Sequence, residues 1–160
     1  MIHRLLLLNT VLAIGLTAAE YPKMGPDIYD TTADAQVDIA AALTTARAEG
    51  KHVMLDFGAN WCVWCHRLHQ LFTKDDTVAT ALDQNFVVVM VDVNKRNGPA
   101  RNAATVARYN DPTQHGLPVL VVLDADGKIL TTQETGALEA GPAHDPTKVM
   151  AFLRQWGPGR

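Results

Sequence analysis

Two apolar runs that do not alternate with polar residues mark the centre of the predicted fold. Residues 52–57 form the first run, closed by Gly58, and the valine-rich residues 86–93 form the second. A strand with one solvent-facing side alternates, so these runs predict strands buried on both faces of a sheet. Two later runs, 118–123 and 128–132, flank the turn sequence Asp-Ala-Asp-Gly and predict an antiparallel hairpin.

Segments with helical spacing of apolar residues separate these strands. Gly50 follows the first segment, and Pro99 stands in the first turn of the fourth. The predicted helices are 34–48, 61–72, a stretch capped by Asp75 or Asp76 that runs to about Gln84, 99–109 and 146–156. This order of elements predicts an α/β fold, with one domain built on a central mixed β-sheet flanked by helices.

The first 19 residues have the three-part pattern of a secretory signal peptide. A short basic start is followed by an apolar stretch, 5–16, and by small residues before Glu20. The stretch is shorter than the ~20 apolar residues of a transmembrane helix, although an uncleaved anchor is the alternative. We therefore expect a periplasmic or secreted protein with no stable membrane association after cleavage. Residues 20–33, with two prolines and a glycine, predict an extended lead-in to a domain at 34–160.

Composition narrows the possible functions further. The chain has 160 residues, 48% of them hydrophobic and 19% charged, which is enough to bury the core of one domain. Its net charge of −3 and its scattered lysines and arginines argue against nucleic acid as a partner. The two cysteines rule out a small protein held together by many disulfides. We expect a monomer.

The segment Cys62-Val-Trp-Cys65-His66 carries the candidate chemistry, and its first interpretation is a redox dithiol. A strand, a short connection and a helix that begins at Cys62 place this residue at a helix N-terminus. The backbone N–H groups and the helix dipole stabilise a thiolate there. Cys65, three residues later, shares the same face and can close a small disulfide ring, so one thiol attacks and the other resolves. No metal or organic cofactor is needed for this reaction.

Two other interpretations use the same residues. Cys-x-x-Cys-His is also the c-type haem signature, but Met90 lies within an apolar strand and Met150 in the last helix, neither in an obvious loop for an axial ligand. A zinc site would use the two cysteines with His66 and His69, and four ligands from one short helix converge poorly on a tetrahedron. We therefore favour the dithiol. A haem protein and a non-catalytic binding module remain the alternatives.

The sequence resembles the thioredoxin superfamily in several places. Residues 56–65, Asp-Phe-Gly-Ala-Asn-Trp-Cys-Val-Trp-Cys, resemble its active-site segment, and Gly116-Leu117-Pro118 is similar to its cis-proline loop. Gly136 matches the glycine after the last strand. The resemblance covers residues 34–156 and is closest to secreted thioredoxin-like proteins with Trp-Cys-x-Trp-Cys. It implies a thioredoxin-like fold and a thiol:disulfide oxidoreductase that acts on protein disulfides and is reset by a redox partner.

Five residues around the dithiol complete the candidate site. Asp56 interrupts a strand predicted to be buried, so we expect a raised pKa and a role in relaying protons to Cys65. Trp61 and Trp64 flank the dithiol and are expected to contact the substrate. In the resembled fold, Leu117-Pro118 is cis, faces the dithiol and offers backbone groups that pair with a substrate peptide.

Three departures from the resembled family affect the prediction. The residues between the cysteines are Val63-Trp64, which leaves the direction of electron flow open, and Met90 stands where the family often has a lysine partner of the buried aspartate. His66 replaces the usual lysine or arginine and shares a helix face with Cys62, so we predict that it tunes the redox potential. The remaining candidates are expected to be solvated: His69, His115 and His144.

Overall fold

The computed structural model describes residues 24–96 and 98–159. The predicted signal peptide, residues 1–19, lies outside this part of the chain. Within it, no helix is long and apolar enough to cross a membrane. Residues 24–33, the described part of the lead-in, contain neither helix nor strand.

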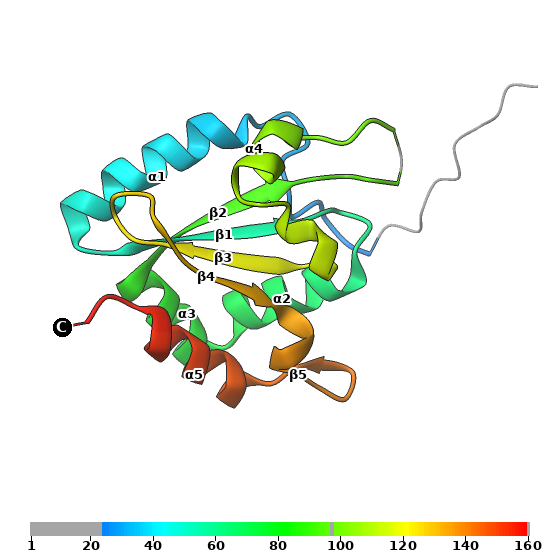
Figure 1. Ribbon diagram of the computed structural model, residues 1–160. Helices are drawn as coiled ribbons and strands as arrows, with labels where there is room; N and C mark the ends of the chain where they lie inside the picture. The colour runs from blue at the N-terminus through cyan, green and yellow to red at the C-terminus, as the bar shows by residue number, and fades with distance from the viewer. Residues whose placement is uncertain (1–23, 97, 160) are drawn as a thin grey trace, which may run out of the picture.

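A four-stranded mixed sheet forms the centre of the fold, as predicted (Figure 1). Its strands are β1 (His52–Gly58), β2 (Phe86–Asp92), β3 (Val119–Leu123) and β4 (Ile129–Glu134). The spatial order is β2-β1-β3-β4, with β1 parallel to β2 and antiparallel to β3, and with β3 and β4 joined as an antiparallel hairpin. All residues of β1 after His52 are buried, because both faces of this inner strand are covered by helices.

Helices cover both faces of the sheet in the described part of the chain (Figure 1). They are α1 (Ala35–Glu49), α2 (Val63–Lys74), α3 (Asp76–Asn85), α4 (Ala103–Arg108) and α5 (Pro146–Trp156). α1 and α4 pack on one face, where Val53, Leu55 and Phe57 contribute to the core. α2, α3 and α5 pack on the other face, against Met54 and its neighbours on β3. Successive residues of β1 therefore belong to two separate cores.

Aspartate side chains begin three of these helices. Asp34 accepts the backbone N–H of Gln36 at 2.9 Å and caps α1, while Asp75 and Asp145 cap α3 and α5 in the same way. Such caps satisfy N–H groups that have no partner within the helix. Gly50 ends α1 with φ +66°, a conformation that favours glycine. These local signals explain why the three helices lie close to their predicted positions.

The helix predicted at 99–109 is shorter than expected, and Pro99 lies outside it. α4 begins only at Ala103, because Asn102 adopts a left-handed conformation with φ +52°. Its side chain holds this turn by accepting the N–H of Ala35 at 3.1 Å and by donating to the carbonyl of Asp92 at 2.9 Å. Bonds to segments far away in the sequence therefore set the start of α4.

Several elements were not predicted. Two 3₁₀ helices, 112–115 and 135–138, precede and follow the hairpin, and a small hairpin joins β5 (Glu139–Ala140) to β6 (Ala143–His144). The helix expected from Trp61 begins at Val63 and runs on to Lys74. The added elements are short and the start of α2 shifts by two residues, so the order of the predicted elements is unchanged.

A buried ion pair closes the end of β2 beside the site. Asp92 is 1% exposed, and its carboxylate accepts a hydrogen bond from Arg101 Nε. The other carboxylate oxygen accepts the N–H of Asn94 at 3.3 Å. The pair thus fixes both ends of the loop that connects β2 to α4.

Candidate active site

The dithiol lies at the N-terminus of α2, immediately after the connection from β1. Cys62 is the N-cap residue, and its Sγ accepts the backbone N–H of Cys65 at 3.1 Å. The two cysteines form a disulfide with a Cα–Cα distance of 5.2 Å. Cys62 is 6% exposed and Cys65 is 0% exposed, so Cys62 carries the sulfur that a partner reaches first. The N–H directed at Cys62 Sγ favours a thiolate at this position.

The loop before β3 places backbone groups beside this sulfur. The Leu117–Pro118 peptide is cis, and the Leu117 carbonyl oxygen lies 3.5 Å from Cys62 Sγ. Thr135 Oγ1 donates to the Pro118 carbonyl at 2.7 Å and anchors the loop to the segment after β4. The Leu117 N–H has no hydrogen-bond partner among the described residues. The Leu117–Pro118 peptide therefore lies directly beside Cys62.

Asp56 is fully buried in the middle of β1, two residues before Gly58. Its exposed fraction is 0%, and burial raises its pKa from 3.8 to about 7. The hydroxyl of Tyr29 donates to Asp56 Oδ1 at 3.0 Å and partly opposes this rise, while Oδ2 has no partner in the described part of the chain. Met90 lies opposite Asp56 in the pairing of β1 with β2. A tyrosine thus contacts the carboxyl group whose expected lysine partner is absent from position 90.

Tyr29 is a site residue that the sequence analysis missed. It comes from the lead-in and is 2% exposed, and Asn60 fixes its backbone on both sides. Asn60 Oδ1 accepts the N–H groups of Ile28 and Tyr29 at 2.9 Å each, and Asn60 Nδ2 donates to the Tyr29 carbonyl at 2.9 Å. The lead-in has no periodicity, so nothing in its sequence links Tyr29 to a strand residue 27 positions away.

Gly58 allows Tyr29 and the dithiol to approach each other. A Cβ atom at Gly58 would collide with the Tyr29 hydroxyl and would lie 2.8 Å from Cys65 Sγ. The hydroxyl and the sulfur therefore share the small space above the Gly58 backbone, where only a residue without a side chain fits.

Trp61 forms one flank of the dithiol and is anchored to the loop after β2. Its Nε1 donates to Asn94 Oδ1 at 3.0 Å. The guanidinium carbon of Arg96 lies 4.2 Å from the centre of the indole ring, within the range of a cation–π contact. The indole also packs against the cluster of Tyr29 and the two cysteines.

Trp64 forms the other flank, and its contacts correct one expectation. Arg67 lies 4.5 Å from its ring centre, and the ring of His144 meets it edge to face at 5.6 Å. His144, expected to be solvated, is buried because β6 packs onto α2. Neither of its ring nitrogens has a partner in the described chain, and burial lowers its pKa. Of the other two histidines expected to be solvated, His115 is exposed. His69 is half-buried, and its pKa is lowered mainly by burial.

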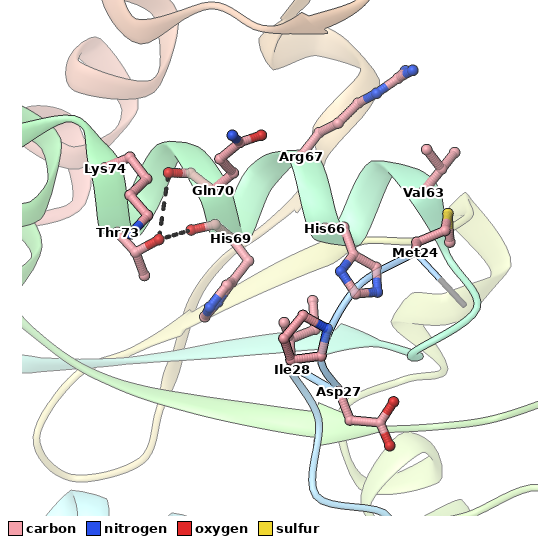
Figure 2. Close-up of a pocket in the computed structure, with 11 residues that line it drawn as sticks. Met24, Asp27, Ile28, Val63, His66, Arg67, His69, Gln70, Thr73 and Lys74 are labelled. Carbon is pink, nitrogen blue, oxygen red and sulfur yellow. Dashed lines mark hydrogen bonds between the residues drawn. The ribbon is translucent and has the colours of Figure 1, made fainter. Parts of the chain in front are cut away.

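His66 points away from Arg67 into an open groove between α2 and the lead-in (Figure 2). The groove has a volume of about 920 Å³ and is lined by Met24, Ile28 and His69 among others. His66 Nε2 donates to the backbone carbonyl of Asn60 at 2.9 Å, which holds the imidazole against the turn that precedes Cys62. The side chain thus reaches back toward the helix N-terminus, as its position in the sequence predicted.

The structure also bears on the metal and haem interpretations. Among residues 24–96 and 98–159, no three histidine, cysteine, aspartate or glutamate side chains are arranged to hold a metal ion. The two sulfurs that a zinc site or haem thioethers would use are bonded to each other.

Comparison with known proteins identifies the family. A family model described as thioredoxin-like matches residues 34–125, more than half of the chain. The chain belongs to the thioredoxin-like family. A disulphide isomerase from Xylella fastidiosa Temecula1, known from its crystal structure, superimposes with a TM-score of 0.70 at 30% identity, covering 80% of this chain and 95% of that one. The predicted superfamily and fold are thereby confirmed.

Curated relatives of this thioredoxin-like chain agree in name. Thiol:disulfide interchange protein DsbD of Pseudomonas fluorescens is 30% identical over 127 residues, which make up 79% of this chain and 19% of that protein. DsbD of Actinobacillus pleuropneumoniae is 35% identical over 94 residues, 58% of this chain and 15% of that protein. The chain therefore spans less than a fifth of these relatives. The names of these relatives describe thiol–disulfide interchange, the chemistry that the sequence analysis predicted for this chain.

Proposed function

We propose that this protein catalyses thiol–disulfide exchange with disulfides of partner proteins. The observation that carries the proposal is the position of Cys62 Sγ, at the N-terminus of α2 and 3.5 Å from the Leu117 carbonyl oxygen. A helix terminus that favours a thiolate and a backbone segment that can align a peptide thus meet at one sulfur atom. The names of the relatives, thiol:disulfide interchange protein and disulphide isomerase, support the same chemistry.

The exchange proceeds through a mixed disulfide. With the dithiol reduced, the Cys62 thiolate attacks one sulfur of a substrate disulfide and releases the other as a thiolate. Cys65 then gives up its proton, and its thiolate attacks Cys62 Sγ. The second substrate sulfur leaves as a thiolate, and the Cys62–Cys65 disulfide seen in the structure is formed. The reverse sequence of the same steps oxidises a substrate dithiol.

The buried carboxyl group of Asp56 serves the resolving step. With a pKa of about 7, it can accept the Cys65 proton and return it at neutral pH. Leu117 and Pro118 align the substrate backbone, while Trp61 and Trp64 bound the space through which it reaches Cys62. We place this activity in the periplasm or outside the cell, on the pattern of residues 1–19, with a separate redox partner to reset the dithiol.

Trapping of intermediates tests the division of labour between the cysteines. Cys65→Ser should accumulate mixed disulfides with a model substrate such as insulin, because the resolving thiol is gone. Cys62→Ser should trap none and should lose insulin reduction altogether. Non-reducing gels and intact-mass spectrometry measure both. Equal trapping by the two variants would refute the assignment of Cys62 as the nucleophile, and no exchange by the unmodified protein would refute the proposed function.

A second prediction concerns His66. A protonated imidazole at the first turn of α2 stabilises the Cys62 thiolate by ~0.5–1 kcal/mol. His66→Ala should therefore raise the pKa of the Cys62 thiol and shift the reduction potential by roughly 10–20 mV to more negative values. Thiolate absorbance and equilibration with glutathione buffers measure the two quantities. His69→Ala, on the same helix and in the same groove, is the matched control and should change neither.

A further inference from the structure

The proposed function leaves open how a proton moves between two groups that are both sealed from solvent. Asp56 and Cys65 are each 0% exposed, so the proton must move inside the protein and not through bulk solvent. The Tyr29 hydroxyl is bonded to Asp56 Oδ1 at 3.0 Å and shares the space above Gly58 with Cys65 Sγ. It is thus the polar group that faces both the acid and the resolving sulfur.

The position of this hydroxyl is fixed by three features. Asn60 makes three hydrogen bonds to the backbone of residues 28–29, and the tyrosine ring is buried beside both cysteines. Gly58 leaves room for the hydroxyl where any side chain would displace it. A solvated tyrosine in a mobile lead-in would show none of these contacts, so the arrangement indicates a built connection.

We propose that the Tyr29 hydroxyl relays the proton between Cys65 and Asp56, an inference that rests on the proposed function. A phenol donates one hydrogen bond while it accepts another, as a relay requires. In the resolving step, Tyr29 passes its hydroxyl proton to Asp56 Oδ1 and takes up the thiol proton of Cys65. The products are a Cys65 thiolate and a neutral Asp56, and Tyr29 ends as it began.

The charges around Tyr29 and Asp56 fit a proton relay. Burial and the neighbouring carboxylates of Asp56 and Asp92 raise the pKa of Tyr29, so the phenol keeps its proton at neutral pH. Among the described residues, the titratable groups near Tyr29 are Asp56 of β1, Cys62 and Cys65 at the start of α2, and Asp92 of β2, which pairs with Arg101. A carrier that stays neutral while its neighbour titrates near pH 7 can run the transfer in both directions.

Tyr29→Phe tests the relay because it keeps the ring and removes only the hydroxyl. Formation of the mixed disulfide at Cys62 should proceed at the normal rate, whereas its resolution should slow at least about tenfold. The increase of the resolution rate through pH 7 should disappear, as it should in Asp56→Asn, and the double variant should be no slower than either single one. Stopped-flow mixing with a disulfide-linked peptide separates the two steps. Tyr109→Phe, at a buried tyrosine packed on Phe57, is the matched control.

Two results would overturn the relay. One is a Tyr29→Phe protein that resolves at the normal rate with the normal pH profile. The other is a resolution rate that Tyr29→Phe lowers by the same factor at every pH, with the double variant slowed by the product of the two single effects. That result would indicate a structural role alone. If Tyr29→Phe does not fold, Asn60→Ala decides instead, since it loosens the tyrosine and should also slow resolution; an unchanged rate overturns the proposal. Failure of the mixed disulfide to form in the unmodified protein would instead refute the proposed function.

Discussion

Asp56→Asn is expected to stabilise the protein, and by more at pH 8 than at pH 4. Burial raises the folded-state pKa of Asp56 from 3.8 to about 7. Between pH 3.8 and about pH 7 the folded carboxyl keeps its proton while the unfolded one loses it. The free energy of unfolding therefore falls as the pH rises through this range. Above pH 7 the folded protein carries the full cost of a buried charge, on the order of 4 kcal/mol for such a shift. Asparagine carries no charge and can still accept the Tyr29 hydrogen bond.

Urea unfolding at pH values from 4 to 8 measures this difference. The stability gain of Asp56→Asn should be near zero at pH 4 and should level off above pH 7. Asp83→Asn, at an exposed position of α3, is the matched control and should show no such trend. A gain that is the same at pH 4 and pH 8 would mean that the carboxyl is not buried as a titrating group. Since the same variant loses the carboxylate proposed to accept the Cys65 proton during resolution, stability and activity should change in opposite directions.

Arg101→Gln is expected to destabilise the protein by about 2–3 kcal/mol. It leaves the Asp92 carboxylate buried without its cation, and such uncompensated charges are costly. The Arg101 side chain is 32% exposed, so water partly screens the pair and we take a value below that of a fully buried one. Asp92 also holds the N–H of Asn94, whose side chain anchors Trp61. The variant should therefore loosen one flank of the dithiol as well.

Chemical denaturation and tryptophan fluorescence check the two parts of this prediction. Arg47→Gln is the matched control, because Arg47 and Asp126 form a pair at 3.6 Å with both side chains more than half exposed. Its loss should cost less than about 0.5 kcal/mol. If Arg101→Gln is no more harmful than Arg47→Gln, the Asp92 carboxylate must find another partner or reach water.

The elements that the sequence predicted well are those encoded by neighbouring residues. Asp34 and Gly50 define α1, and an apolar run interrupted only by Asp56 defines β1 after His52. Each of these signals acts over a few residues and does not depend on the rest of the fold. The same holds for Cys62 at the N-terminus of α2.

The features that the sequence analysis missed depend on contacts between distant segments. Tyr29 meets Asp56 only because Asn60 pins the lead-in, and His144 is buried only because β6 packs against Trp64. Asn102 delays the start of α4 by bonding to two other segments. No periodicity or composition of the local segment reports such pairings, since they exist only after the elements have packed.

The three hydrogen bonds from Asn60 to the backbone of residues 28–29 bear on where this domain should be considered to begin. The family match starts at residue 34, and a recombinant fragment cut there would retain the dithiol, its helix and the buried acid. It would lack Tyr29, leaving Asp56 Oδ1 without its hydrogen-bond donor and opening a void beside the two cysteines. We therefore expect the functional unit to extend upstream of residue 34 and to include residues 28–29, and assays on shorter fragments would test a protein without the Tyr29–Asp56 hydrogen bond.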